Sequence, residues 1–267
     1  MPLCHMINRK ILRLSGADAR PFLQGLLTQD VTALSADTPL YAGLLSPQGK
    51  ALFQLFLFAA GAGDGDGDDV LIDVAADQIE ALAKRLTMFR LRKQVQIAPE
   101  TGLAVWQQWG EASRHPADPR TPLAGSRFLS PAAVMTATIE DWHAHRLPLG
   151  LPEADEIGSD DLLWLETDAR ELNGVSFTKG CYTGQENTAR MHHRDKLRKQ
   201  LLPVRLSGPS APDAKVMAGD RVAGELRGAR HGDLQMAIFR TEYADQPLAV
   251  DGTPAVLIRP PWMQAGD

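Results

Sequence analysis

Residues 177–186 combine a cysteine, a lysine and two glycines in a spacing that could support thiol chemistry. Thr183 and Glu186 have the spacing of a capping box, in which the threonine hydroxyl accepts a hydrogen bond from the Glu186 amide, so a helix is expected to begin here. Cys181 would then lie just ahead of a helix N-terminus, where the partial positive charge favours a thiolate. Lys179 would add a second cation. The segment therefore predicts a reactive or metal-ligating thiol at Cys181.

Three other interpretations of Cys181 stay open at this point. A small buried cysteine in a turn would have the same local sequence. A cysteine–histidine pair of the hydrolase type could use His192 or His193, although the expected helix carries both away from its own N-terminus. A zinc site of the Cys2His2 type lacks ligands, because no second cysteine is near in sequence and His143 and His145 are isolated.

The thiol segment opens the most basic stretch of the chain. Residues 179–205 contain seven Lys and Arg against two acids, a net charge of +5, so the rest of the chain carries −10 and the whole chain −5. A solvated helix face is the ordinary explanation for such a run, whereas a binding role requires an anionic partner. The overall negative charge argues against a dedicated nucleic-acid binder.

The flanking patterns predict an α+β body that positions this segment. A helix is expected after residues 15–18, where cap-forming residues precede a proline and a stripe of leucines. The pattern of residues 44–58 predicts a β-hairpin that turns at 47–50. A strand at 70–74, an amphipathic helix at 76–92 and a strand at 94–97 are expected to follow.

The remaining segments predict loops and a separate β unit. Residues 61–69 alternate glycine and aspartate like a solvated loop, and a calcium-loop pattern fails because Asp69 and Ala75 stand where glycine and glutamate belong. Prolines in residues 111–125 predict a linker or surface loop. Residues 201–259 show evenly spaced short strand patterns without a helical stripe, which predicts a small barrel or sandwich.

The 267-residue composition, 44% hydrophobic and 23% charged, is that of an ordinary globular protein. No apolar run approaches the roughly 18 residues of a transmembrane helix. The start of the chain shows no targeting pattern, and two cysteines cannot form a disulfide framework. These observations predict a cytoplasmic protein in a reducing compartment that contacts neither membrane nor nucleic acid.

Residues 179–186 have the sequence Lys-Gly-Cys-Tyr-Thr-Gly-Gln-Glu and, with Arg190, match the K-G-C-[FY]-x-G-Q-E signature of the YgfZ-type folate-binding proteins. This group resembles the glycine-cleavage T-protein, an aminomethyltransferase, in fold. The signature is complete, and further stretches resemble the family in order along nearly the whole chain. They are residues 16–31, 45–50, 118–125 and 146–153.

The resemblance implies a T-protein-like (GcvT-like) α+β fold, in which three subdomains form a ring around a central cavity that takes tetrahydrofolate. Residues 1–199 would form the folate-binding body, with the hairpin–helix unit at about 44–98 in one of two interleaved subdomains. Residues 200–267 would form the C-terminal β-barrel. The thiol motif would lie at the rim of the cavity, with Cys181 and Lys179 as its functional groups. The implied folate-binding residues are Gly180, Tyr182, Gly184, Gln185, Glu186 and Arg190.

Members of this family are implicated in maturing or repairing [4Fe–4S] proteins, including the radical enzymes that methylthiolate tRNA. The resemblance therefore implies a tetrahydrofolate-binding factor for iron–sulfur cluster assembly, with Cys181 as a transient ligand of iron or sulfur. Because a [4Fe–4S] cluster normally takes four cysteines, the cluster would be shared with a partner, either an assembly protein or the recipient enzyme. The basic residues 190–199 would attract the anionic folate tail or dock an acidic partner.

The enzymatic alternative is tetrahydrofolate-dependent aminomethyl transfer of the T-protein type. That chemistry needs a carboxylate near the folate nitrogens, which T-proteins carry in a G-G-x-x-D-D hairpin. In the matching hairpin of this chain, Phe53 and Gln54 stand where the two acids belong, and neither can act as a base. The sequence therefore disfavours a classical enzyme. A cysteine hydrolase is disfavoured too, because no base or oxyanion hole can be assigned.

Overall fold

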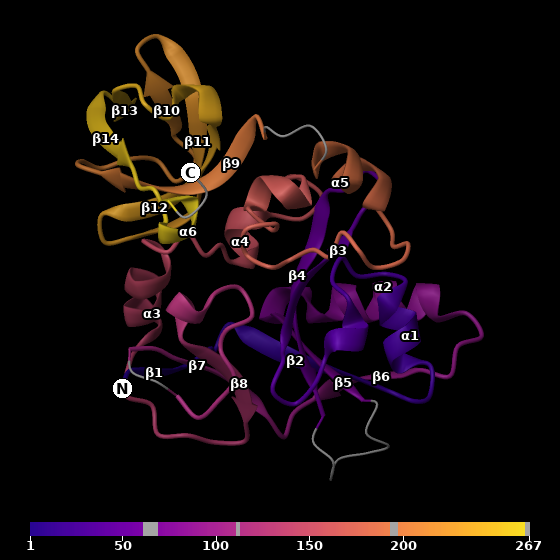
Figure 1. Cartoon of the computed structure of the whole chain (residues 1–267). Coiled ribbons are helices and arrows are strands. Elements are labelled where there is room, and N and C mark those ends of the chain that lie inside the picture. The colour runs from indigo at the N-terminus through magenta and orange to yellow at the C-terminus, as the bar shows by residue number, and fades with distance from the viewer. Residues whose placement is uncertain (61–68, 111–112, 193–196, 265–267) are drawn as a thin grey trace.

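The structure, a computed structural model, describes the whole chain except residues 61–68, 111–112, 193–196 and 265–267. Its helices and strands form three groups, two in the body and one in a C-terminal barrel (Figure 1). No helix in the described residues is long and apolar enough to cross a membrane. The aspartate-rich loop for which calcium was considered lies mostly outside the described residues.

The first group is an antiparallel sheet with two helices packed on one face. Its elements are β2 (Arg9–Ser15), α1 (Ala19–Gln24), β3 (Leu40–Leu45), β4 (Ala51–Ala59), β5 (Val70–Ala75), α2 (Ile79–Arg90) and β6 (Gln96–Glu100). The strands lie in the order β3-β4-β5-β2-β6. The helix, hairpin, strand, helix and strand expected between residues 15 and 97 are thereby confirmed, with shifted ends.

Both faces of this sheet are covered by a hydrophobic core. Successive side chains of a strand point to opposite faces, so a single strand can contribute to both cores. In β4, Leu55 and Leu57 pack in one hydrophobic core with Leu23 and Leu82 from the two helices. Phe56, between the two leucines in sequence, belongs to a different core on the other face. The sheet therefore presents its second face to the rest of the molecule, where the polar site described below is built.

The second group contains a smaller sheet and three helices. Its elements are β1 (Leu3–His5), β7 (Ala104–Gln108), β8 (Ser126–Ser130), α3 (Ile139–Arg146), α4 (Ala154–Ile157) and α5 (Gln185–His192). The sheet order is β1-β7-β8, so the first strand of the chain pairs with a strand a hundred residues away.

Short 3-10 helices are distributed over all three groups. They lie at Val31–Ala33, Ala76–Gln78, Pro122–Ala124, Trp164–Thr167 and Thr241–Tyr243.

The third group is a closed barrel with the strand order β10-β11-β12-β9-β14-β13, which confirms the predicted C-terminal β unit. Its elements are β9 (Lys199–Leu206), β10 (Lys215–Ala218), β11 (Arg221–His231), β12 (Leu234–Arg240), β13 (Leu248–Val250), β14 (Thr253–Leu257) and α6 (Pro261–Gln264). The chain therefore has the predicted α+β architecture of three subdomains, one of them a barrel.

The barrel is joined to the body by packing as well as by the chain. Met236 in β12 belongs to the same hydrophobic core as Trp142 and Trp164 of the body. Arg227 in β11 donates to the main-chain carbonyls of Glu156 and Ile157. These contacts fix the barrel against α4 and leave a cavity at the junction.

The prediction of a linker or surface loop at residues 111–125 is wrong in its central part. Asp118 and Arg120 are both buried and form an ion pair of 2.9 Å between Oδ2 and Nη2. The Arg120 amide also donates to Asp118 Oδ1 at 3.0 Å. The proline-rich segment can run through the interior because its two opposite charges satisfy each other there.

Candidate functional site

The thiol motif forms a loop that packs against the turn of the β3–β4 hairpin. Gly184 has a φ of +84°, and a Cβ on it would lie only 2.6 Å from the Ser46 carbonyl oxygen. Asn187 Nδ2 donates to the carbonyl of Gln48 at 2.7 Å. The expected capping box is therefore wrong, since a left-handed Gly184 makes the helix begin at Gln185, beyond the reach of a Thr183 cap.

Cys181 and Cys4 have opposite environments. Both thiols are free, Cys181 on the surface and Cys4 with 0% exposure in the core. Burial, together with Asp141 and Glu140, raises the pKa of Cys4 to about 11. The space beside Cys181 is open too, since a Cβ added at Gly180 would meet no atom within 4 Å apart from its chain neighbours. Within the described part of the chain, Cys181 is the accessible thiol.

Lys179 does not serve as a free cation beside Cys181. Its Nζ donates to three main-chain carbonyl oxygens, those of Gln24 at 2.7 Å, Leu27 at 2.6 Å and Gln29 at 3.0 Å. Burial lowers the pKa of Lys179 to about 8. Since these bonds use all three ammonium protons, the side chain ties the motif loop to the end of α1, and the structure gives it a positioning role.

The other motif residues divide between the interior and the surface. Tyr182 is buried in the body core, with its ring 5.2 Å from Lys179 Nζ. Glu186 and Arg190 are on α5, where Glu186 is exposed, and Gln185 is half-buried. Arg190 Nη2 donates to Asn187 Oδ1 at 2.7 Å. Arg190 also lines a cavity of about 300 Å³ between α5, the 3-10 helix Trp164–Thr167 and the residues just before β9.

A separate cavity of about 400 Å³ lies where the three subdomains meet. Its lining includes residues from all three subdomains, among them Arg9 of β2, His143 of α3, Glu153 before α4 and His231 of β11. Among the residues that the structure describes, no residue of the 177–190 segment lines this cavity. The residues predicted to bind folate are therefore not brought to this junction cavity, and their role stays a prediction.

Glu153, one of the residues that line this cavity, is an ionised carboxylate that accepts no hydrogen bond. It is 3% exposed, and neither carboxylate oxygen accepts a hydrogen bond. Arg9 Nη1 lies 3.6 Å and Arg120 Nη1 3.9 Å from these oxygens. Burial by itself would raise the pKa of Glu153, but Arg120, Arg9 and Arg127 outweigh it and hold the pKa at about 2.

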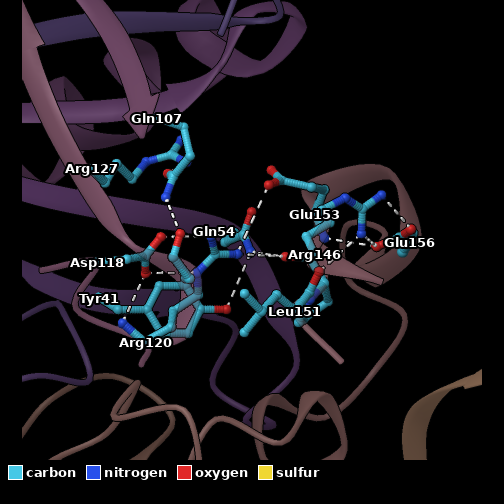
Figure 2. A network of polar contacts seen from close by, with 12 residues as sticks. Tyr41, Gln54, Gln107, Asp118, Arg120, Arg127, Arg146, Leu151, Glu153 and Glu156 are labelled. Atoms are coloured by element: carbon cyan, nitrogen blue, oxygen red, sulfur yellow. Dashed lines mark hydrogen bonds and ion pairs between the residues drawn. The ribbon is translucent and has the colours of Figure 1, made fainter. Parts of the chain in front are cut away.

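A network of buried arginines and acids surrounds Glu153 (Figure 2). Asp73 accepts from Arg9 at 2.6 Å and pairs with Arg127 at 2.7 Å. Arg146 pairs with Glu156 at 2.8 Å. Sequence reasoning missed this network, although Arg120, Arg146 and Glu153 lie in two of the stretches that carry the family resemblance, residues 118–125 and 146–153. The family matches at these positions were the signal from which the buried network could have been predicted.

The hairpin position that carries acids in T-proteins is occupied by a neutral, hydrogen-bonded side chain. Gln54 is buried, and its Nε2 donates to the Pro152 carbonyl at 2.7 Å and to the Tyr41 hydroxyl at 3.2 Å. Phe53 is buried in the core against α1 and α2. This placement offers no base for aminomethyl transfer. Among the described residues, no three His, Cys, Asp or Glu side chains are grouped to hold a metal ion.

Two comparisons define the class of protein. The chain is similar in structure to the glycine cleavage system aminomethyltransferase T from Bartonella henselae, with a TM-score of 0.68 and 12% identity over 98% of this chain and 86% of that one. Residues 198–265 match the family model of the CAF17 C-terminal beta-barrel domain. The fold is therefore a T-protein-like body with a CAF17-type barrel.

Sequence relatives give the particular family. The mitochondrial iron-sulfur cluster assembly factor IBA57 of Mus musculus is 32% identical over 94% of this chain and 81% of its own length. The human protein of the same name is 33% identical over 91% of this chain and 78% of its own length. The chain belongs to the IBA57 family of iron-sulfur cluster assembly factors.

These relatives confirm the expected role in iron–sulfur cluster assembly and correct the expected location in the cell. An iron–sulfur assembly factor of T-protein-like fold is what the motif resemblance implied, while the narrower YgfZ assignment stays a prediction. The predicted cytoplasmic location is wrong by this comparison, because the relatives from mouse, human and Coccidioides immitis are named as mitochondrial proteins.

Proposed function

We propose that this chain assists the assembly or repair of [4Fe–4S] proteins by offering Cys181 as a transient ligand in a cluster shared with a partner. The observation that carries the proposal is the exposed thiol on a loop anchored at both ends, by Lys179 to the end of α1 and by Gly184 to the hairpin turn. A single accessible cysteine cannot complete the usual four-cysteine ligation. The remaining ligands come from the assembly protein or the recipient enzyme.

Complementation with matched cysteine variants tests this function. In cells lacking the chain, [4Fe–4S] enzyme activity is expected to return with the wild type and with Cys4→Ser, but not with Cys181→Ser. Both variants must accumulate as folded protein, checked by their unfolding midpoints. Full rescue by Cys181→Ser would overturn the role of the thiol.

The junction cavity is the proposed site of tetrahydrofolate or a related folate. A buried carboxylate whose two oxygens accept no hydrogen bond favours a ligand that donates N–H groups, because an unsatisfied buried acceptor costs free energy. The amino-pyrimidinone edge of a folate ring supplies such donors. The residues expected to hold it are Glu153, as acceptor, and Arg9 and His143, as neighbours in the wall.

Titration calorimetry distinguishes the cavity from the motif. The wild type is expected to bind tetrahydrofolate, and Glu153→Gln is expected to weaken binding by about tenfold or more, since it removes a charged acceptor. Arg190→Ala tests the motif helix instead and is expected to bind as the wild type does. Absence of binding by the wild type would overturn the folate proposal, and a loss confined to Arg190→Ala would move the site to the motif.

A further inference from the structure

An open groove of about 940 Å³ runs between α1 and the end of α2. Its α1 wall includes Pro21, Phe22 and Leu26, and its other wall is the segment from Phe89 to Lys93. The floor is apolar, because Phe22 and Leu26 belong to the core of the first subdomain. The amphipathic helix expected at residues 76–92 ends here, and the function proposed above does not use its end.

The end of α2 presents large apolar side chains to solvent. Leu91 is 86% exposed and has a φ of +48°, a conformation that non-glycine residues rarely adopt. Phe89, one turn from the buried Leu86, is 42% exposed. Exposed apolar groups gathered around a groove mark binding surfaces, and backbone strain that persists points to function.

The segment that carries Leu91 is fixed in place. Its Gln94 amide donates to Asp18 Oδ2 at 2.7 Å, and the Gln94 carbonyl accepts from the Asp18 amide at 3.3 Å. Arg90 Nη1 donates to the Val95 carbonyl at 3.1 Å. Gly16 permits this close approach, because a Cβ there would lie 2.3 Å from the Gln94 carbonyl oxygen. Leu91 is therefore held outward as a preformed anchor.

The charges around the groove are mainly positive. Arg90, Arg92 and Lys93 line it, and the last two are exposed. Asp18 is the acid in its lining, and one of its carboxylate oxygens already accepts from Gln94. An apolar floor with a basic rim is complementary to an amphipathic helix that carries acidic residues.

The end of α1, beside the groove, contacts Lys179 of the thiol motif. Lys179 Nζ donates to the carbonyls of Gln24 and Leu27, which flank the groove residues Gly25 and Leu26. We propose that the groove between α1 and α2 docks an acidic amphipathic helix of the protein that shares the cluster with Cys181. The identity of that partner rests on the proposed function, whereas the docking itself does not require the thiol.

A fluorescent synthetic helix of about 18 residues, long enough to be helical, provides the probe. It carries leucines at i, i+4, i+7 and i+11 and glutamates on the opposite face, and a second peptide has lysines in place of the glutamates. Anisotropy with the full chain is expected to show binding of the acidic peptide and about tenfold weaker binding of the basic one.

Variants locate the binding surface. Leu91→Glu and Arg92→Glu are expected to weaken binding of the acidic peptide by about tenfold, while Met88→Glu, at an exposed α2 residue outside the groove lining, is expected to leave it unchanged. Cys181→Ser is expected to bind like the wild type, which separates docking from cluster ligation. Equal binding of both peptides, no binding, or loss with Met88→Glu would overturn the proposal. Binding of the groove to anionic phosphatidylserine vesicles in place of the peptide would also overturn it.

Discussion

At the scale of single residues, the two cysteines provide an internal comparison. They share one chain, but Cys4 is packed in the core whereas Cys181 sits on an open loop beside Gly180. Reactivity of a thiol depends on access and on its fraction of thiolate. The structure therefore assigns different chemistry to each.

Thiol titration of the native protein at about pH 8 checks this assignment. Cys181 is expected to react with a disulfide reagent within minutes, while Cys4, with a pKa raised to about 11 by burial, is expected to react only after denaturation. The Cys181→Ser variant should show no rapid phase. A rapid phase that survives in this variant would contradict the burial of Cys4.

His143 makes stability depend on pH. Burial, Arg146 and His231 lower the pKa of His143 from 6.5 to about 3, and Arg146 Nε donates to its Nδ1 at 2.8 Å, so the folded protein keeps the ring neutral. Between these pH values the unfolded chain binds the extra proton. The free energy of unfolding should therefore fall as the pH drops below 6.5, by at most about 1.4 kcal/mol per pH unit.

Urea unfolding at about pH 7 and about pH 5.5 measures this slope. His143→Gln, which keeps an acceptor for Arg146 and cannot titrate, is expected to reduce the difference between the two pH values. An identical difference in wild type and variant would show that His143 does not carry it.

The sequence identified the exposed thiol but not the task of Lys179. The motif pattern was sufficient to single out Cys181, because local spacing carries that signal. A lysine side chain reaches far, and whether its ammonium meets a thiolate or three carbonyls from residues 24–29 depends on tertiary packing. No local pattern reports that packing.

At the scale of elements, the two motif glycines differ in what they make possible. Gly184 has a φ of +84° and would place a Cβ 2.6 Å from the Ser46 carbonyl oxygen, whereas Gly180 has open space around it. Gly184→Ala is expected to lower the free energy of unfolding by about 1–3 kcal/mol, because it forces strain and a clash. Gly180→Ala is expected to change it by no more than about 0.5 kcal/mol. Urea denaturation of the pair measures both, and equal effects would contradict the described loop packing.

The Asp118–Arg120 turn is a second element that tolerates little change. Arg120→Ala removes a buried cation from between Asp118 and Glu153 and should cost about 3–5 kcal/mol in the free energy of unfolding. Arg170→Ala is the matched control, since its ion pair with Glu171 is exposed and adds little. Denaturation curves that shift equally for both variants would show that the buried network contributes no more than a surface pair.

Elements were predictable where a hydrophobic period was present. The β3–β4 hairpin, β5 and α2 follow from alternation or from a helical stripe. The buried turn at residues 118–120 did not, because charged and proline-rich residues indicate a surface loop unless their partners are known. Asp118 and Arg120 pair with each other, but the further partner Glu153 is distant in sequence.

At the scale of the whole molecule, the barrel and the body share one hydrophobic core. Met236 of β12 packs in the same cluster as Trp142 and Trp164 of the body. We therefore expect a single unfolding transition, in which tryptophan fluorescence and far-ultraviolet circular dichroism coincide. Met236→Ala should move that entire transition to lower urea, at a cost of about 2–5 kcal/mol. A barrel that melts separately from the body would contradict the shared core.

The three-subdomain architecture was implied by the family resemblance rather than by periodicity. Local patterns predicted an α+β body and an appended β unit, but the pairing of β1 with β7 and the cavity between subdomains are arrangements of distant segments. Such arrangements cannot be read from neighbouring residues alone.

The same long-range pairing has a consequence for synthesis on the ribosome. Strand β1 cannot pair until β7 has been synthesised. Lys179 donates to a carbonyl 155 residues earlier in the chain, and the shared core lacks Met236 until β12 has been made. A chain whose contacts close such long loops folds slowly and late. Its apolar sheet faces stay uncovered meanwhile, so the nascent protein is expected to depend on chaperones until the barrel strands emerge.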